Sequence, residues 1–114
     1  MKIYHNSRCS KSRQTLALIE ENGVTPEIVN YLEDCPSKDE LAAVLAKLDL
    51  PATKIIRFKE AIAKELGIKA KDDKTQDQWL DLIVANPKLL ERPIVIKGDK
   101  AIIGRPPENV LKLV

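Results

Sequence analysis

The sequence predicts an α/β fold in which a β-α-β unit and a β-β-α unit share one four-stranded mixed sheet, with a helical insert between them. Short β-branched segments stand near both ends of the chain, and helical apolar spacing dominates its middle. The 114 residues, 44% hydrophobic and 32% charged, have the size and balance of one globular domain. We therefore expect a single domain over residues 1–114 with the insert at about 37–90.

The first part of the chain has the pattern of a strand, a helix and a second strand. An apolar segment at residues 3–4 is followed by Leu16 and Ile19 at helical spacing, and Asn-Gly at 22–23 is a C-terminal helix signal. Residues 28–32 are β-branched and aromatic. Because only one helix connects the two strands, we predict a right-handed βαβ unit with parallel strands.

Three helices are predicted in the middle of the chain. The first begins at a capping box formed by Ser37 and Glu40. The second is expected at about residues 55–66 and ends at Gly67, and the third begins at another capping box that starts at Thr75.

At the end of the chain, short β-branched runs replace the helical spacing of the middle, and the pattern predicts an antiparallel hairpin followed by a last helix. The apolar runs 94–96 and 101–103 flank a Gly-Asp turn at 98–99. The prolines at 106–107 suit the first turn of a helix. The buried face of that helix is predicted to consist of Val110, Leu111 and Val114.

Composition excludes several classes of function. Nineteen basic residues against 17 acidic ones give a net charge of +2 without a basic block, so we expect no nucleic-acid partner. Two cysteines and one histidine lack metal-ligand spacing, so we expect no metal site. Nothing resembles a signal peptide or a membrane span, which favours a cytoplasmic monomer with no membrane contact and with reduced thiols.

Cys9 is the candidate nucleophile. It stands at the predicted start of the first helix, where backbone N–H groups favour an anion, and Arg8 and Arg13 flank it. Such surroundings lower a cysteine pKa from about 8.5 toward values between 3.5 and 7.5. The alternative is a small hydrophobic residue that fills the strand-helix junction. His5 fits a base or hydrogen-bond partner of the thiolate, or a structural donor.

Three arginines form a second candidate cluster. Arg57 ends a predicted helical segment, while Arg92 and Arg105 each precede a proline at the two ends of the hairpin. Guanidinium groups bind tetrahedral oxyanions in a bidentate manner, so arginines beside a thiolate can hold phosphate, arsenate, sulfate or a carboxylate. The alternative is solvated surface charge. Cys35 either resolves a disulfide with Cys9 or is a surface thiol.

Several separated motifs together resemble the ArsC family of glutaredoxin-dependent arsenate reductases. They run in the family's order over essentially the whole chain: His5-Asn6-x-x-Cys9-x-x-Ser12-Arg13, Arg57, Glu91-Arg92-Pro93-Ile94-Val95 and Gly104-Arg105-Pro106. The resemblance implies a thioredoxin-like fold with a helical insert. In such folds a cis-proline directly before a strand faces the active cysteine, and Pro93 holds the matching position.

The resemblance also implies a mechanism. Cys9 matches the catalytic cysteine that forms a thiol-arsenate adduct, and His5 and Ser12 match groups that stabilise the thiolate. The oxyanion-binding arginines of the family correspond to Arg57, Arg92 and Arg105. Glutathione as co-substrate and glutaredoxin as partner would then complete the reduction to arsenite, in arsenic detoxification, without a bound cofactor.

Two departures from the family pattern leave alternatives open. Well-established arsenate reductases carry a small residue at the position of Arg8, and in this respect the chain resembles the chromosomal YfgD-type branch of the family instead. Cys35 has no counterpart in the family pattern. One alternative is a glutathione-linked thiol oxidoreductase of unknown substrate. The other is an Spx-like redox-sensing transcriptional regulator, which is disfavoured because Ser12 stands where the sensor has its second cysteine.

Overall fold

The chain forms two compact units in a computed structural model that describes all residues from Met1 to Val114. The first unit combines Met1–Asp34 with Arg92–Val114, and the second consists of Cys35–Glu91. No helix is both long and apolar enough to cross a bilayer.

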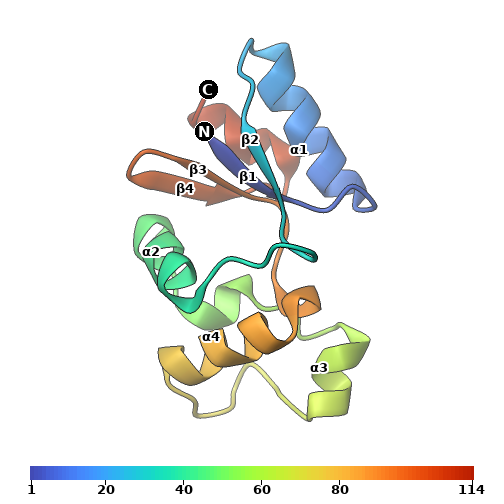
Figure 1. Cartoon of the computed structure of the whole chain (residues 1–114), viewed down its shortest axis with the longest axis vertical. Helices are drawn as coiled ribbons and strands as arrows, with labels where there is room; N and C mark the ends of the chain where they lie inside the picture. The colour runs from blue at the N-terminus through green and yellow to red at the C-terminus, as the bar shows by residue number, and fades with distance from the viewer. The chain divides into compact units, whose positions relative to one another are not determined.

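The first unit contains one mixed sheet, as the sequence predicts. Its strands have the order β2-β1-β3-β4, with β1 parallel to β2 and the other pairs antiparallel (Figure 1). The elements are β1 (Lys2–His5), α1 (Ser10–Glu21), β2 (Glu27–Asn30), β3 (Ile94–Lys97), β4 (Lys100–Ile103) and the 3₁₀ helix η3 (Pro107–Lys112).

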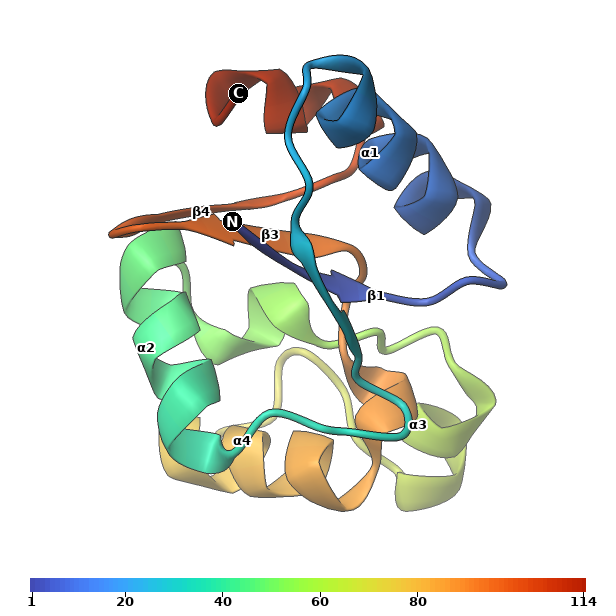
Figure 2. The same ribbon diagram turned by 45° about the horizontal axis from the view of Figure 1, so that its top comes forward.

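A hydrophobic core joins this sheet to α1 and η3, which lie together on one of its faces (Figure 2). Ile3 and Val95 are direct partners on neighbouring strands. Both side chains are fully buried, as are Ile19 of α1 and Val110 of η3. Each such side chain contributes roughly 1.5–3 kcal/mol through burial, so the core fixes α1, and the loop before it, against the end of β1.

The last helix differs from the prediction in type and in its buried face. It is a 3₁₀ helix, in which Val110 and Leu113 are buried, whereas Leu111 and Val114 are 47% and 38% exposed. A 3₁₀ helix has three residues per turn, so positions i and i+3 share a face. The prediction was therefore right for Val110 and wrong for Leu111 and Val114.

The hairpin is confirmed, but β2 is shorter than predicted. Gly98 adopts a φ of +61° in the turn between β3 and β4. In contrast, β2 ends at Asn30, because the backbone carbonyl of Asn30 accepts hydrogen bonds from the N–H groups of Glu33 and Asp34. This turn draws the chain away from the sheet after the point where β1 also ends.

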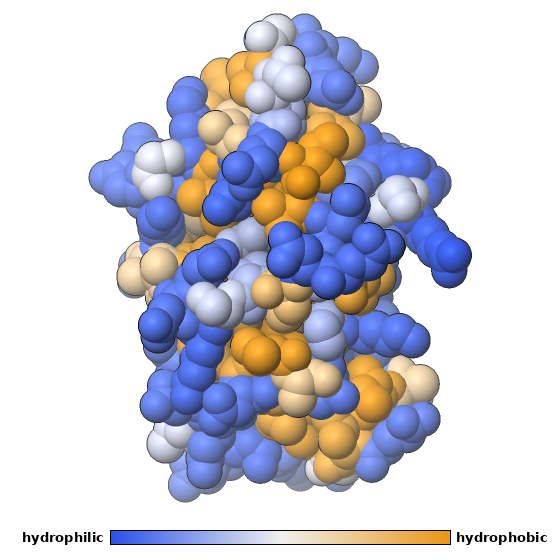
Figure 3. All heavy atoms as spheres, in the orientation of Figure 1, coloured by the Kyte–Doolittle hydropathy of each residue, from blue (hydrophilic) through white to orange (hydrophobic).

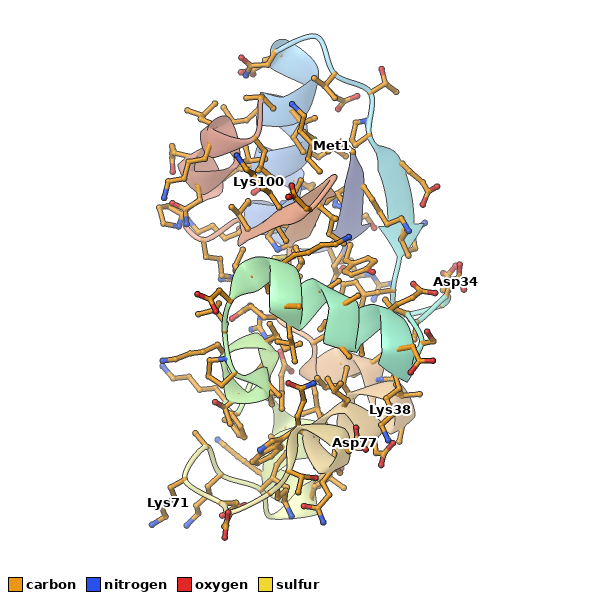
Figure 4. The ribbon with its side chains drawn as sticks, turned by 90° about the vertical axis from the view of Figure 1, so that its left-hand side faces the viewer. Met1, Asp34, Lys38, Lys71, Asp77 and Lys100 are labelled. Carbon is orange, nitrogen blue, oxygen red and sulfur yellow. The ribbon has the colours of Figure 1, made fainter.

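The second unit is helical. Its elements are α2 (Lys38–Leu48), the 3₁₀ helix η1 (Ala52–Ile55), α3 (Ala61–Leu66), α4 (Gln76–Ala85) and the 3₁₀ helix η2 (Pro87–Leu89). Lys38 of α2 forms ion pairs with Asp77 and Asp81 of α4, at 3.6 Å and 3.1 Å (Figure 4). All three side chains are substantially exposed, so these pairs orient the two helices more than they stabilise them.

The two predicted capping boxes differ in the structure. At α4 the box is complete, because Thr75 accepts from the Gln78 N–H and the Gln78 side chain accepts from the Thr75 N–H. At α2, Ser37 Oγ accepts from the Glu40 N–H at 3.2 Å, but the Glu40 carboxylate does not accept from the Ser37 N–H. The prediction of a full box at Ser37 was therefore wrong in its second half.

The helix predicted at about residues 55–66 is interrupted. Its first part is η1, and α3 begins only at Ala61. Between them, Ile56 forms an antiparallel bridge with Leu90, and the Arg57 N–H donates to the Leu89 carbonyl at 2.7 Å. Pairing with a distant segment thus replaces the helical hydrogen bonds that local spacing indicated. Gly67 ends α3 with a φ of +67°, as predicted.

Candidate active site

Cys9 is the N-cap residue of α1 and follows a tight loop after β1. Its backbone N–H donates to the Asn6 carbonyl at 3.0 Å, and its own carbonyl accepts from the Arg13 N–H at 3.0 Å. The Asn6 side-chain oxygen also accepts from the Arg8 N–H at 3.0 Å. Cys9 is only 8% exposed and lies at the end of the helix that carries unpaired N–H groups.

His5 and Ser12 form a buried pair that anchors this loop. His5 Nδ1 and Ser12 Oγ are 2.6 Å apart, and Ser12 Oγ accepts from the Asn6 N–H at 3.1 Å. Burial lowers the pKa of His5, and the positive charge of Arg13 lowers it further. Both effects favour the neutral imidazole. The pair connects the end of β1, the loop and the first turn of α1.

Two guanidinium groups meet the thiol of Cys9. Arg105 Nη2 lies 3.5 Å from Cys9 Sγ, while Arg105 Nε donates to the Arg92 carbonyl at 2.8 Å. The Arg92 side chain also hydrogen-bonds the sulfur. Both arginines come from the ends of the β3–β4 hairpin, so the sheet brings them to the residue that α1 presents.

The net effect of these surroundings is a lowered pKa of Cys9. Burial of the thiol raises its pKa, but the backbone N–H groups of Ser12 and Lys11 and the guanidinium of Arg92 together outweigh burial. The prediction that Arg8 and Arg13 supply the positive charge that lowers the pKa of Cys9 is wrong. Arg13 donates to the Ser7 carbonyl at 2.8 Å instead, and the side chain of Arg8 is exposed.

Three further residues hold the arginines in place, and sequence reasoning did not assign them a role. Asn109 Nδ2 donates to the carbonyls of Ile103 and Arg105, at 3.2 Å and 3.1 Å. Thr15 packs against Gly104, whose N–H donates to the Pro93 carbonyl at 2.9 Å. The peptide bonds that follow Arg92 and Arg105 are both cis.

Arg57 and Cys35 belong to the second unit. Arg57 Nε lies 3.0 Å from Glu60 Oε1, and Arg57 Nη1 lies 3.6 Å from Glu91 Oε1. Cys35 is half-buried, and it and Cys9 are both free thiols. The first unit thus brings together His5, Cys9, Ser12, Arg92 and Arg105 among the predicted site residues, and Arg57 as an oxyanion ligand stays a prediction.

The fold and site define a thioredoxin-like protein whose cysteine lies at a helix N-terminus beside two guanidinium groups. The sequence profile of the ArsC family matches residues 4–113, and the chain belongs to the ArsC family.

Relatives span nearly the full length of the chain. The protein named YfgD of Escherichia coli strain K12, described as uncharacterised, is 49% identical, with 100% of this chain and 96% of the relative covered. An arsenate reductase of Neisseria meningitidis is 44% identical, with 96% and 94% covered. The solved structure of an arsenate reductase from Vibrio cholerae is 42% identical, with a TM-score of 0.93 and coverage of 99% and 96%.

Proposed function

We propose that this protein reduces arsenate to arsenite through a thiol-arsenate adduct on Cys9, with glutathione and glutaredoxin as electron donors. The observation that carries the proposal is the contact of Cys9 Sγ with the guanidinium groups of both Arg92 and Arg105. A nucleophile and two oxyanion donors stand in one place. Membership of the ArsC family, and relatives named arsenate reductase, support arsenate as the oxyanion.

The first step is nucleophilic attack by the Cys9 thiolate on arsenic. A sulfur–arsenic bond forms, and one arsenate oxygen takes up a proton and departs as water, so arsenic remains pentavalent. Negative charge on the remaining oxygens is stabilised by fixed guanidinium donors in a partly desolvated site more than by water. The lowered pKa of Cys9 increases the fraction of the sulfur that is ionised at a given pH, which favours this attack.

The later steps require two electrons from two further thiols. Glutathione attacks the adduct and displaces a second oxygen as water. A glutaredoxin thiolate then attacks the glutathione sulfur and forms a mixed disulfide, and the electron pair of the broken sulfur–arsenic bond reduces arsenic to the trivalent state. Hydrolysis then releases arsenite and regenerates Cys9. Such donors belong to a reducing cytoplasm.

The other site residues act around this centre. His5 and Ser12 position the loop and the helix turn whose N–H groups hold the thiolate. Arg57 is proposed as a third oxyanion ligand on the resemblance alone, and its two carboxylate partners keep its guanidinium in a defined place within the second unit.

The test is steady-state formation of arsenite with glutathione, glutaredoxin and a coupled glutathione reductase. Cys9→Ser is expected to abolish turnover, and Cys35→Ser, the matched control, to leave it unchanged. Arg92→Ala and Arg105→Ala should each lower kcat by about 10²–10³-fold, the usual cost of one oxyanion donor. Arg57→Ala tests the third ligand in the same assay. Wild-type-like turnover by Cys9→Ser would contradict the proposal.

A glutathione-linked thiol oxidoreductase of another substrate is the second candidate, because a low-pKa thiol serves disulfide chemistry equally well. The two functions separate experimentally. Rapid alkylation of Cys9 without arsenite formation from arsenate would favour the oxidoreductase, whereas saturable arsenite formation that requires both arginines favours the arsenate reductase.

A further inference from the structure

A cavity of about 270 Å³ lies in the first unit beside the loop that leads to Cys9. It opens between the ends of β1 and β2, where His5 and Asn30 are partners in the parallel pair. Asn6 and Arg8 line it from one loop, and Leu32 and Glu33 from the other. Crevices outside the carboxyl ends of parallel strands are common ligand sites.

The cavity carries one cation and one anion that the protein itself does not neutralise. The structure gives neither the Arg8 guanidinium nor the Glu33 carboxylate a hydrogen bond or an ion pair within the chain. The amide nitrogen of Asn6 and the side chain of Asn30 also lack protein partners. A charged pair and two amides on one small cavity therefore present a set of groups suited to a zwitterion.

This charge pattern does not suit arsenate. An arsenate dianion gains from Arg8 but is repelled by Glu33, and the two guanidinium groups that suit it lie at Cys9 Sγ. Glutathione, in contrast, carries an α-ammonium group, two carboxylates and two amides. Leu32, which is 42% exposed, offers the same ligand an apolar contact. The surface drawn in Figure 3 shows hydrophobic residues among hydrophilic ones.

The cavity also lies close to the candidate active site at Cys9. His5 contacts Ser12 through Nδ1 and is also a lining residue of the cavity, so one residue borders both the active-site loop and the cavity. Arg8 is directly bonded to Cys9 in the chain. A thiol peptide bound here lies next to the segment that ends in the nucleophile, which lowers the entropic cost of the second thiol attack.

We propose that this cavity is the binding site of the thiol co-substrate, with Arg8 bound to a carboxylate of glutathione and Glu33 to its ammonium group. Asn6 and Asn30 bind the amides of the same peptide. The proposal rests on the proposed use of glutathione, and it gives Arg8, the residue that departs from the family pattern, a role in co-substrate binding.

Binding is tested with S-methylglutathione, which cannot react, by titration followed in ¹H–¹⁵N NMR spectra. Arg8→Ala and Glu33→Gln should each weaken binding by about tenfold, the cost of one charge-assisted hydrogen bond. Matched controls are Lys100→Ala, an exposed cation at the far end of the hairpin, and Asp34→Asn, the acid next to Glu33 (Figure 4). Unchanged affinity in both cavity variants would overturn the site.

Kinetics distinguish failure of the site from failure of the proposed function. Arg8→Ala should raise KM for glutathione about tenfold, while KM for arsenate and the rate with 2-mercaptoethanol, which carries no charge, stay unchanged. If arsenite forms but neither KM nor S-methylglutathione binding responds, the cavity is not the site. If S-methylglutathione binding depends on Arg8 and Glu33 but no arsenite forms, the site stands and arsenate is the wrong substrate.

Discussion

Gly104 occupies a position where the packing around the site leaves no room for a side chain. A Cβ atom there would lie 2.6 Å from Thr15 Oγ1 and 2.7 Å from Pro93 Cγ. Carbon atoms pack at about 3.5–4.0 Å, so the neighbours would have to retreat by roughly 1 Å. Both are buried, one on α1 and one before β3. Overpacking costs about 1–3 kcal/mol, and we expect the upper part of this range for Gly104→Ala.

The assay is unfolding followed by circular dichroism in heat and in urea. A loss of about 2–3 kcal/mol corresponds to a fall in Tm of roughly 10 °C for a chain of this length. Gly23→Ala is the control, because Gly23 has open space but a φ of +78°, which costs about 1 kcal/mol. Thr15→Ala should relieve part of the cost of Gly104→Ala and none of the cost of Gly23→Ala. The steric argument would be refuted if Gly104→Ala lowered the free energy of unfolding by less than about 0.5 kcal/mol, or if Thr15→Ala did not reduce the cost of Gly104→Ala.

Three further predictions concern ionisation and helix capping. The pH of half-maximal alkylation of Cys9 by iodoacetamide should lie below that of an ordinary cysteine, and Arg92→Ala should move it upward, because the guanidinium lowers the pKa of Cys9; an unmoved profile would contradict this cause. Burial and the charge of Arg13 lower the pKa of His5 in the folded protein, so the unfolded chain takes up its proton at higher pH. The free energy of unfolding should therefore fall as pH drops below about 6.5, and His5→Gln should flatten this slope in urea titrations; an equal slope in both proteins would argue against it. Thr75→Ala should cost about 1 kcal/mol in urea unfolding and more than Ser37→Ala, since the box at α4 is complete and that at α2 is not.

Elements with strong local signals could be predicted from the sequence. The cap at Thr75, the stop at Gly67 and the turn at Gly98 depend on residues within one turn of the backbone, and all three are in the structure. The segment around Ile56 could not be predicted in this way. Its apolar spacing fits a helix, but its hydrogen bonds go to residues 89–91, more than thirty positions away. A local pattern carries no information about such a partner.

The residues of the candidate site differ in the same way: some are marked by local sequence, and others are brought together only by tertiary structure. Cys9 could be identified because a helix N-terminus is a local feature, and the direction of its pKa shift follows from that position. The cause of the shift could only partly be foreseen, since sequence neighbours are not neighbours in space. Arg8 lines a cavity and does not lower the pKa of the neighbouring thiol. Arg92 does so, although it is more than eighty residues from Cys9 in the chain. Asn109 acts through backbone carbonyls, which any residue supplies, so no side-chain pattern marks it. Sequence motifs thus reveal Cys9, His5, Ser12 and the arginines, whereas a residue that acts on backbone atoms, such as Asn109, emerges only from the fold.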